Sequence, residues 1–235
     1  MADISHRILL WDLPLRIFHW SLVVAVSTAI ATGLAGGEWM VVHGRAGLVI
    51  TGLLAFRIVW GLIGSRSAQF ASFFPTPARL LSYVKGQWQG VGHNPLGALS
   101  VIAMLLLLSI QVVTGLVGND DISFTGPLAS LIDEARSYQM TGLHHQLSNV
   151  LYALLGLHVA AIVFYVRIKK HALLGSMVHG YRDVATDTPK PAPARPWKLL
   201  VAILLALTTV YAASGAWIEE TPAPPAQPAQ ATPAW

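Results

Sequence analysis

The sequence predicts an all-α membrane protein, with a four-helix transmembrane bundle followed by a fifth, C-terminal transmembrane helix. Hydrophobic residues make up 54% of the 235-residue chain and charged residues only 11%, whereas soluble domains carry about 25% charged residues. The mean hydropathy is +0.57. Five apolar stretches are each long enough to cross ~30 Å of hydrocarbon as a helix. Composition and segment length therefore both place the chain in a bilayer.

The five spans are expected at residues 17–34, 41–63, 96–117, 147–168 and 197–217. The first could instead be a cleaved signal peptide, because Ala29, Ile30 and Ala31 resemble a cleavage site. We expect a retained helix, since a second span follows at once. Asn94 followed by Pro95 predicts the N-cap and first residue of the third helix.

The connecting segments complete the expected organisation. Residues 64–94 form the one sizeable loop on their side, and their many aromatic residues predict a position in the membrane interface. Residues 1–185 are expected to form the four-helix domain and residues 186–218 the additional helix. The Ala/Pro-rich residues 219–235 are expected to form an extended tail rather than a domain.

Charge predicts the orientation of the spans. Thirteen of the fifteen Lys and Arg residues fall on one side, leaving Arg45 and Arg136 on the other. The positive-inside rule therefore places the N-terminus in the cytoplasm and the C-terminus outside. The pI of about 9.6 then reflects topology, and we expect no nucleic-acid partner. The outer side also carries an acidic group, Asp120, Asp121, Asp133 and Glu134.

Histidine is the residue type that carries a functional signal. The absence of cysteine excludes disulfides, thiolate-bound clusters and covalently attached c-type haem. Imidazole inside a bilayer is costly and is by default a functional hypothesis; the alternative is a helix–helix hydrogen bond. Of the nine histidines, His6, His171 and His179 lie in polar segments, and His93 is expected to be structural. The other five lie in or beside the spans: His19, His43, His144, His145 and His158.

Spacing pairs four of these five histidines. His144 and His158 are 14 residues apart, which is about 40° short of four helical turns, so they share a helix face ~21 Å apart. His145 points about 140° away from His158 and is expected to be interfacial or to support its neighbour. Pairing by depth joins His43 with His144 outside and His19 with His158 inside. The inner pair requires the fourth helix to project beyond the membrane, or the first to sit deep.

Two histidine pairs at two depths indicate two haems. Neutral imidazoles in both axial positions make a low-spin iron suited to electron transfer, with no open position for oxygen. Arg16 lies three residues before His19 on the same helix face, and Arg45 lies two residues after His43. Their guanidinium groups could pair with haem propionates; the alternative is that both extend to lipid headgroups.

Several segments resemble the bacterial cytochrome b-561 and hydrogenase b-type cytochrome family. They are WDLPLRIFHW at residues 11–20, RIVWGLIGSRSAQFASFF at 57–74, GHNPLG at 92–97 and HHQLSNVLYALLGLH at 144–158. The resemblance covers roughly residues 8–185. It implies a di-haem b cytochrome of the bacterial inner membrane that exchanges electrons between the quinone pool (ubiquinone or menaquinone) and a partner redox protein. It also implies that His19, His43, His144 and His158 are the axial ligands. The fifth helix departs from the four-helix members.

Three functions remain open at this point. The first is an electron relay whose outer partner, a periplasmic c-type cytochrome or a hydrogenase, docks on the acidic group; the alternative for that group is simple solvation. The second is a quinone-linked oxidoreductase acting on a small species such as superoxide. The third is a metal transporter that uses the histidines for zinc or copper. It is disfavoured because zinc sites gather their ligands close together.

Overall fold

A computed structural model describes residues 5–185 and 188–218. Five helices in these ranges are long and apolar enough to cross a membrane, which confirms the predicted fold class. They are α1 (Leu13–Ala35), α2 (Met40–Ile63), α5 (Pro95–Val117), α6 (Glu134–Arg167) and α8 (Pro196–Ala213). The tail expected at 219–235 lies outside the described residues.

Polar residues just before the helices fix where three of the spans begin. Asp12 caps α1 by accepting the backbone N–H of Leu15 at 2.8 Å. Asn94 caps α5 by accepting that of Gly97 at 2.7 Å, as the Asn-Pro pair predicted. Asp133 caps α6 through the backbone N–H of Arg136 at 3.0 Å. Each side chain satisfies a donor that the first helical turn leaves free.

The fourth span is longer than expected. We predicted a helix from residue 147, but α6 begins at Glu134 and contains 34 residues. Its length is about 51 Å, against ~30 Å of hydrocarbon. The prediction was wrong because the first turns are too polar to be recognised as part of a span, although Asp133 caps them into the same helix. The added turns lie at the N-terminal end of α6, beyond His144, whereas the inner histidine pair required a projection at the C-terminal end, where α6 ends at Arg167.

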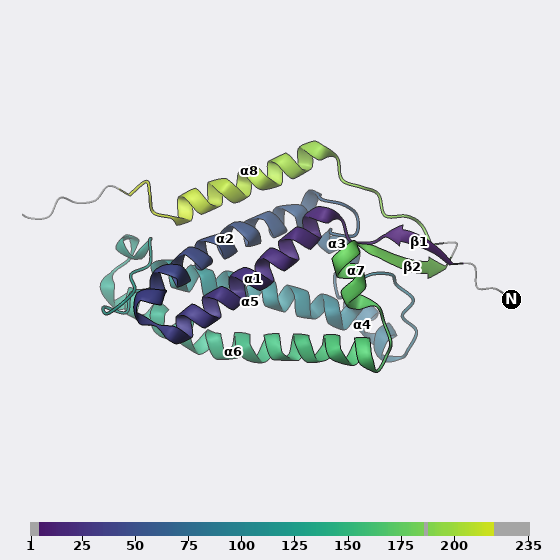
Figure 1. The fold of residues 1–235 in the computed structure, drawn as a ribbon, viewed down its shortest axis with the longest axis horizontal. Helices are drawn as coiled ribbons and strands as arrows, with labels where there is room; N and C mark the ends of the chain where they lie inside the picture. The colour runs from purple at the N-terminus through teal and green to yellow at the C-terminus, as the bar shows by residue number, and fades with distance from the viewer. Residues whose placement is uncertain (1–4, 186–187, 219–235) are drawn as a thin grey trace, which may run out of the picture.

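The spans pack as two helix pairs (Figure 1). α1 packs against α2 and α5 against α6, while α2 also contacts α5; α1 and α6 make at most slight backbone contact. α8 lies along α2, where a Cβ added at Gly52 would be 2.7 Å from Val210. An apolar core containing Ile50, Leu108 and Leu151 joins the two pairs. The space between α1/α2 and α5/α6 is where the histidines meet.

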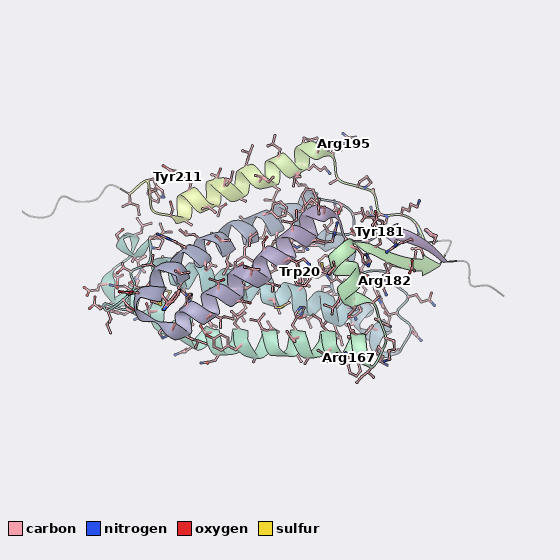
Figure 2. All side chains as sticks on the ribbon, in the orientation of Figure 1. Trp20, Arg167, Tyr181, Arg182, Arg195 and Tyr211 are labelled. Atoms are coloured by element: carbon pink, nitrogen blue, oxygen red, sulfur yellow. The ribbon has the colours of Figure 1, made fainter. Side chains whose placement is uncertain are left out.

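The two ends of the bundle differ. One, here called the hairpin end, carries two strands that the sequence did not predict: β1 (Ser5–Leu9) pairs antiparallel with β2 (Tyr181–Ala185). It also carries α3 (Phe70–Phe73), α4 (Pro77–Val84) and α7 (Leu173–His179). The other, the loop end, carries residues 118–133 with the short 3₁₀ helix η2 (Ala129–Leu131); a second, η1 (Gly37–Trp39), joins α1 to α2. Arg167, Arg182 and Arg195 all lie toward the hairpin end (Figure 2).

Candidate functional site

The structure brings His43 and His144 together at the loop end. His43 comes from α2 and His144 from α6, and their ring centroids are 6.0 Å apart with the planes inclined at 77°. A metal ion between two imidazoles needs a bond of about 2 Å to a nitrogen on each side. The distance from each nitrogen to the centroid of its own ring accounts for the rest of this separation. The geometry therefore suits two ligands on opposite sides of one iron.

Hydrogen bonds fix which nitrogen each ring presents. Nδ1 of His43 lies 2.8 Å from the backbone carbonyl of Ala29, and Nδ1 of His144 lies 2.9 Å from that of Gln111. A carbonyl oxygen only accepts, so both Nδ1 atoms carry the proton and donate it. Nε2 of each ring is left with its lone pair, as in metal-bound histidines whose other nitrogen donates to a carbonyl.

The space around these two rings has room for a flat macrocycle. A cavity of about 490 Å³ is lined by both histidines together with apolar and small residues of α1, α2, α5 and α6. Gly47 lines it one turn after His43, and a Cβ added there would meet nothing within 4 Å. At Gly115 an added Cβ would lie 3.2 Å from His144. The donor set and the cradle both fit the expected haem.

The loop end is closed by a hydrogen-bonded turn. Asp120 accepts the backbone N–H groups of Ile122, Ser123 and Phe124 at 3.0, 2.9 and 2.8 Å. Partial burial raises the pKa of Asp120, but these hydrogen bonds outweigh it and lower the pKa to about 2. The Phe124 ring stands edge-on to His43, with centroids 6.2 Å apart. The turn therefore covers the loop-end pair.

The hairpin-end pair is arranged more loosely. His19 on α1 and His158 on α6 are both partly buried, and His158 lies within electrostatic range of His19. Nδ1 of His19 and Nε of Arg16 are buried without a hydrogen-bond partner among the described residues. Arg16 also donates to the carbonyl of Val178 on α7 at 2.6 Å. A partly buried imidazole and a neighbouring guanidinium, each with one buried nitrogen that lacks a partner among the described residues, fit a haem and one of its propionates.

Two predicted residues lie at the edge of this arrangement. Arg45 is exposed and is not among the residues lining the loop-end cavity. His145 is exposed as well, although it borders the cavity, and its ring centroid is 6.3 Å from that of His144. The structure thus places His144, rather than His145, opposite His43. A propionate-binding role for Arg45 stays a prediction.

Gln111 supports this site although no sequence pattern predicted that role. Its buried side chain donates to the backbone carbonyl of His144 at 2.9 Å and to Oγ of Ser148 at 2.7 Å. Its own carbonyl accepts from the His144 ring. A glutamine in an apolar span is costly unless it has partners, and that cost was the signal available in the sequence.

Arg57 was also missed, because it was counted only as a charge that sets topology. It lies on α2, 14 residues after His43, which is the spacing of His144 and His158 on α6. Only 2% of its surface is exposed. Its guanidinium donates to the carbonyl of Ala68 at 3.1 Å and lies 4.4 Å from the centre of the Phe70 ring. The shared spacing could have identified it as a second interior residue of α2.

Comparisons with known proteins agree with this geometry. Two curated relatives, from Escherichia coli K12 and O157:H7, are each described as a probable Ni/Fe-hydrogenase 1 B-type cytochrome subunit. They are 24% identical to this chain over 48% of its length, and the chain spans 59% of theirs. No solved structure matches. The family model described as prokaryotic cytochrome b561 matches residues 10–180. The chain therefore belongs to the prokaryotic cytochrome b561 family of haem-binding membrane electron-transport proteins.

Proposed function

We propose that this b-type membrane cytochrome holds two haems and carries electrons between the quinone pool at one membrane face and a redox protein at the other. The observation that carries the proposal is the pair His43 and His144, which face each other with both Nδ1 protons directed to backbone carbonyls. The pair His19 and His158 would hold the second haem, farther along α6 toward the hairpin end.

The haems would supply reversible one-electron couples, and the residues of this chain would hold and insulate them. His43 and His144 would each bind through Nε2, with the carbonyls of Ala29 and Gln111 fixing the rings. His19 and His158 would hold the second haem. With two histidines holding each haem, a small oxidant or reductant would have no free position at the iron, and electron transfer between edges would remain. Arg16 and Arg45 are the proposed propionate partners.

The hairpin end is proposed to face the cytoplasm and the loop end the periplasm. Support comes from the basic residues gathered at the hairpin end, among them Arg167, Arg182 and Arg195 (Figure 2). Quinone would exchange electrons with the hairpin-end haem, and a periplasmic c-type cytochrome or hydrogenase with the loop-end haem. Residues 1–185 would then be the electron-carrying domain, and α8 in residues 186–218 an addition along α2.

Stopped-flow spectroscopy of the purified protein tests this function. The haems should be reduced or oxidised rapidly by a redox protein at one end and by a short-chain quinol or quinone at the other. Small species that must bind to iron should react slowly, because two histidines at each haem would leave no free position there. A reaction with superoxide near the diffusion limit, with every protein partner slow, would instead show a quinone-linked oxidoreductase acting on that small species.

A further inference from the structure

The two levels of the bundle differ in the charge that surrounds them. At 100° per residue, the 14 residues from His43 to Arg57 bring Arg57 to within about 40° of the same face of α2. They also carry it ~21 Å toward the hairpin end. His144 and His158 repeat this relation on α6. Thus α2 presents a histidine to the interior at the loop end and an arginine at the hairpin end, where α1 supplies His19.

The charge of Arg57 is not neutralised by a close carboxylate. In residues 5–185 and 188–218, no carboxylate oxygen lies within 4.0 Å of its guanidinium; the one ion pair found there joins Arg136 and Asp133. Asp12 acts on Arg57 only at longer range. Its two oxygens already accept from the backbone N–H of Leu15 at 2.8 Å and from Nε1 of Trp60 at 3.0 Å. Arg57 therefore adds a buried positive charge to this end.

His93 links Arg57 to the hairpin-end pair. It lies within electrostatic range of both Arg57 and His19, and burial together with these two neighbours lowers the pKa of His93 to about 4. Its ring is packed between Trp11 and Phe73, each with a centroid 4.6 Å away. At neutral pH His93 is uncharged, so it leaves the buried positive charge of Arg57 at this end unchanged.

The loop end has the opposite character. Asp120 borders the loop-end cavity and is ionised at neutral pH. His43 and His144 donate Nδ1–H to carbonyls, which makes each ring a stronger electron donor to iron. Nδ1 of His19 has no acceptor among the described residues. Each difference favours oxidised iron at the loop end, and reduced iron at the hairpin end.

We propose that the hairpin-end haem has the more positive midpoint potential, so that electrons run from the loop end to the hairpin end. Gaining an electron removes one positive charge from the iron centre, which a buried cation favours and a carboxylate opposes. A redox protein at the loop end would give up each electron. The transfer would balance, because the one electron lost at the loop-end level would be gained at the hairpin-end level. Two such electrons and two protons convert a quinone to a quinol at the hairpin end.

This inference rests on the proposed function, and spectroelectrochemical titration of the haem bands tests it. Wild-type protein should titrate in two one-electron waves, one for each haem. His144→Ala should lose the wave with the lower midpoint potential. Arg57→Gln should shift the higher wave downward by about tenfold in the reduction equilibrium, which is ~59 mV for one electron. Arg57→Lys should keep it. The matched control is Arg66→Gln, which removes an exposed charge at the same end and should change the equilibrium less than twofold.

Asp120→Asn probes the other level, because it keeps an acceptor oxygen in the turn but removes the charge. It should raise the midpoint potential of the lower wave and leave that of the higher wave unchanged. Two bound haems with the order of the waves reversed would overturn the direction and leave the di-haem function standing, whereas one haem or none would overturn the function. If Arg57→Gln fails to retain haem, the wave lost in His144→Ala and the shift in Asp120→Asn still decide the order.

Discussion

Single hydrogen bonds decide what the candidate ligands can do. Gln111 accepts the Nδ1 proton of His144 with its carbonyl and, with its side chain, holds the carbonyl of His144 and the hydroxyl of Ser148. One residue of α5 thereby fixes both the ring and the backbone of a residue of α6. A bond of this kind is worth about 1 kcal/mol when made, and leaving a buried partner unsatisfied costs about 1–3 kcal/mol.

Neighbouring histidines on α6 should behave differently when they are replaced. His144→Ala is expected to lose about one haem per chain, because its ring faces His43. His145→Ala is expected to keep both, since its exposed side chain lies beside the pair rather than within it. Haem quantified against protein measures the difference. Equal loss in the two variants would show that the register of α6 has been assigned incorrectly.

Two glycines of helical spans offer a matched test of the cradle. Gly115→Ala places a Cβ 3.2 Å from the His144 ring, whereas Gly142→Ala meets nothing within 4 Å. Alanine favours a helix over glycine by about 1 kcal/mol, so Gly142→Ala should slightly raise the melting temperature. Gly115→Ala should weaken retention of the loop-end haem and alter its low-spin EPR signal. Identical spectra for the two variants would contradict the assigned contact.

Among the larger elements, the loop between α5 and α6 combines structure with surface charge. Two of its four acidic residues have structural roles: Asp120 holds the turn, and Asp133 caps α6 and pairs with Arg136. Asp121 and Glu134 remain exposed. Of these four residues, only Asp121 and Glu134 can therefore be neutralised without removing the turn or the cap of α6.

The turn should keep its structure over the physiological pH range. The pKa of Asp120 is lowered from 3.8 to about 2 in the folded chain. Its contribution to stability is therefore complete above pH ~3.8 and is lost as the pH falls toward 2. Hydrogen exchange of residues 118–126, corrected for the intrinsic rate, should show equal protection at pH 5 and 7. Asp120→Ala should lose that protection at both pH values, and protection unchanged by this substitution would contradict the assignment.

Docking on the acidic group can be tested at Asp121 and Glu134, whose replacement leaves the Asp120 turn and the Asp133 cap in place. Neutralising them as Asp121→Asn with Glu134→Gln should slow association with a basic redox partner at low salt, and the effect should shrink as salt screens charges beyond ~8–10 Å. Asparagine suits position 121, whose φ is 60°. Stopped-flow reduction at several salt concentrations measures the rate. An association rate that does not change at low salt would show that these carboxylates do not contribute to docking.

For the molecule as a whole, hydropathy and histidine spacing predicted the spans and the meeting of His43 with His144. Both patterns repeat over short stretches of the chain, so they can be recognised in a single sequence. The start of α6 was missed because capping by Asp133 extends a helix into polar sequence. The β1–β2 pair was missed because its partners are far apart in the chain. The roles of Gln111 and Arg57 depend on neighbours from other segments, which no single segment reveals.

The number of haems per chain shows directly whether both histidine pairs hold a haem. A pyridine haemochrome assay against quantitative amino-acid analysis of the purified protein should give two haems b per chain. His144→Ala and His158→Ala should each give about one, because each removes a ligand from a different level of α6. One haem in the wild-type protein, or none, would contradict the proposal that two histidine pairs hold haems at two depths.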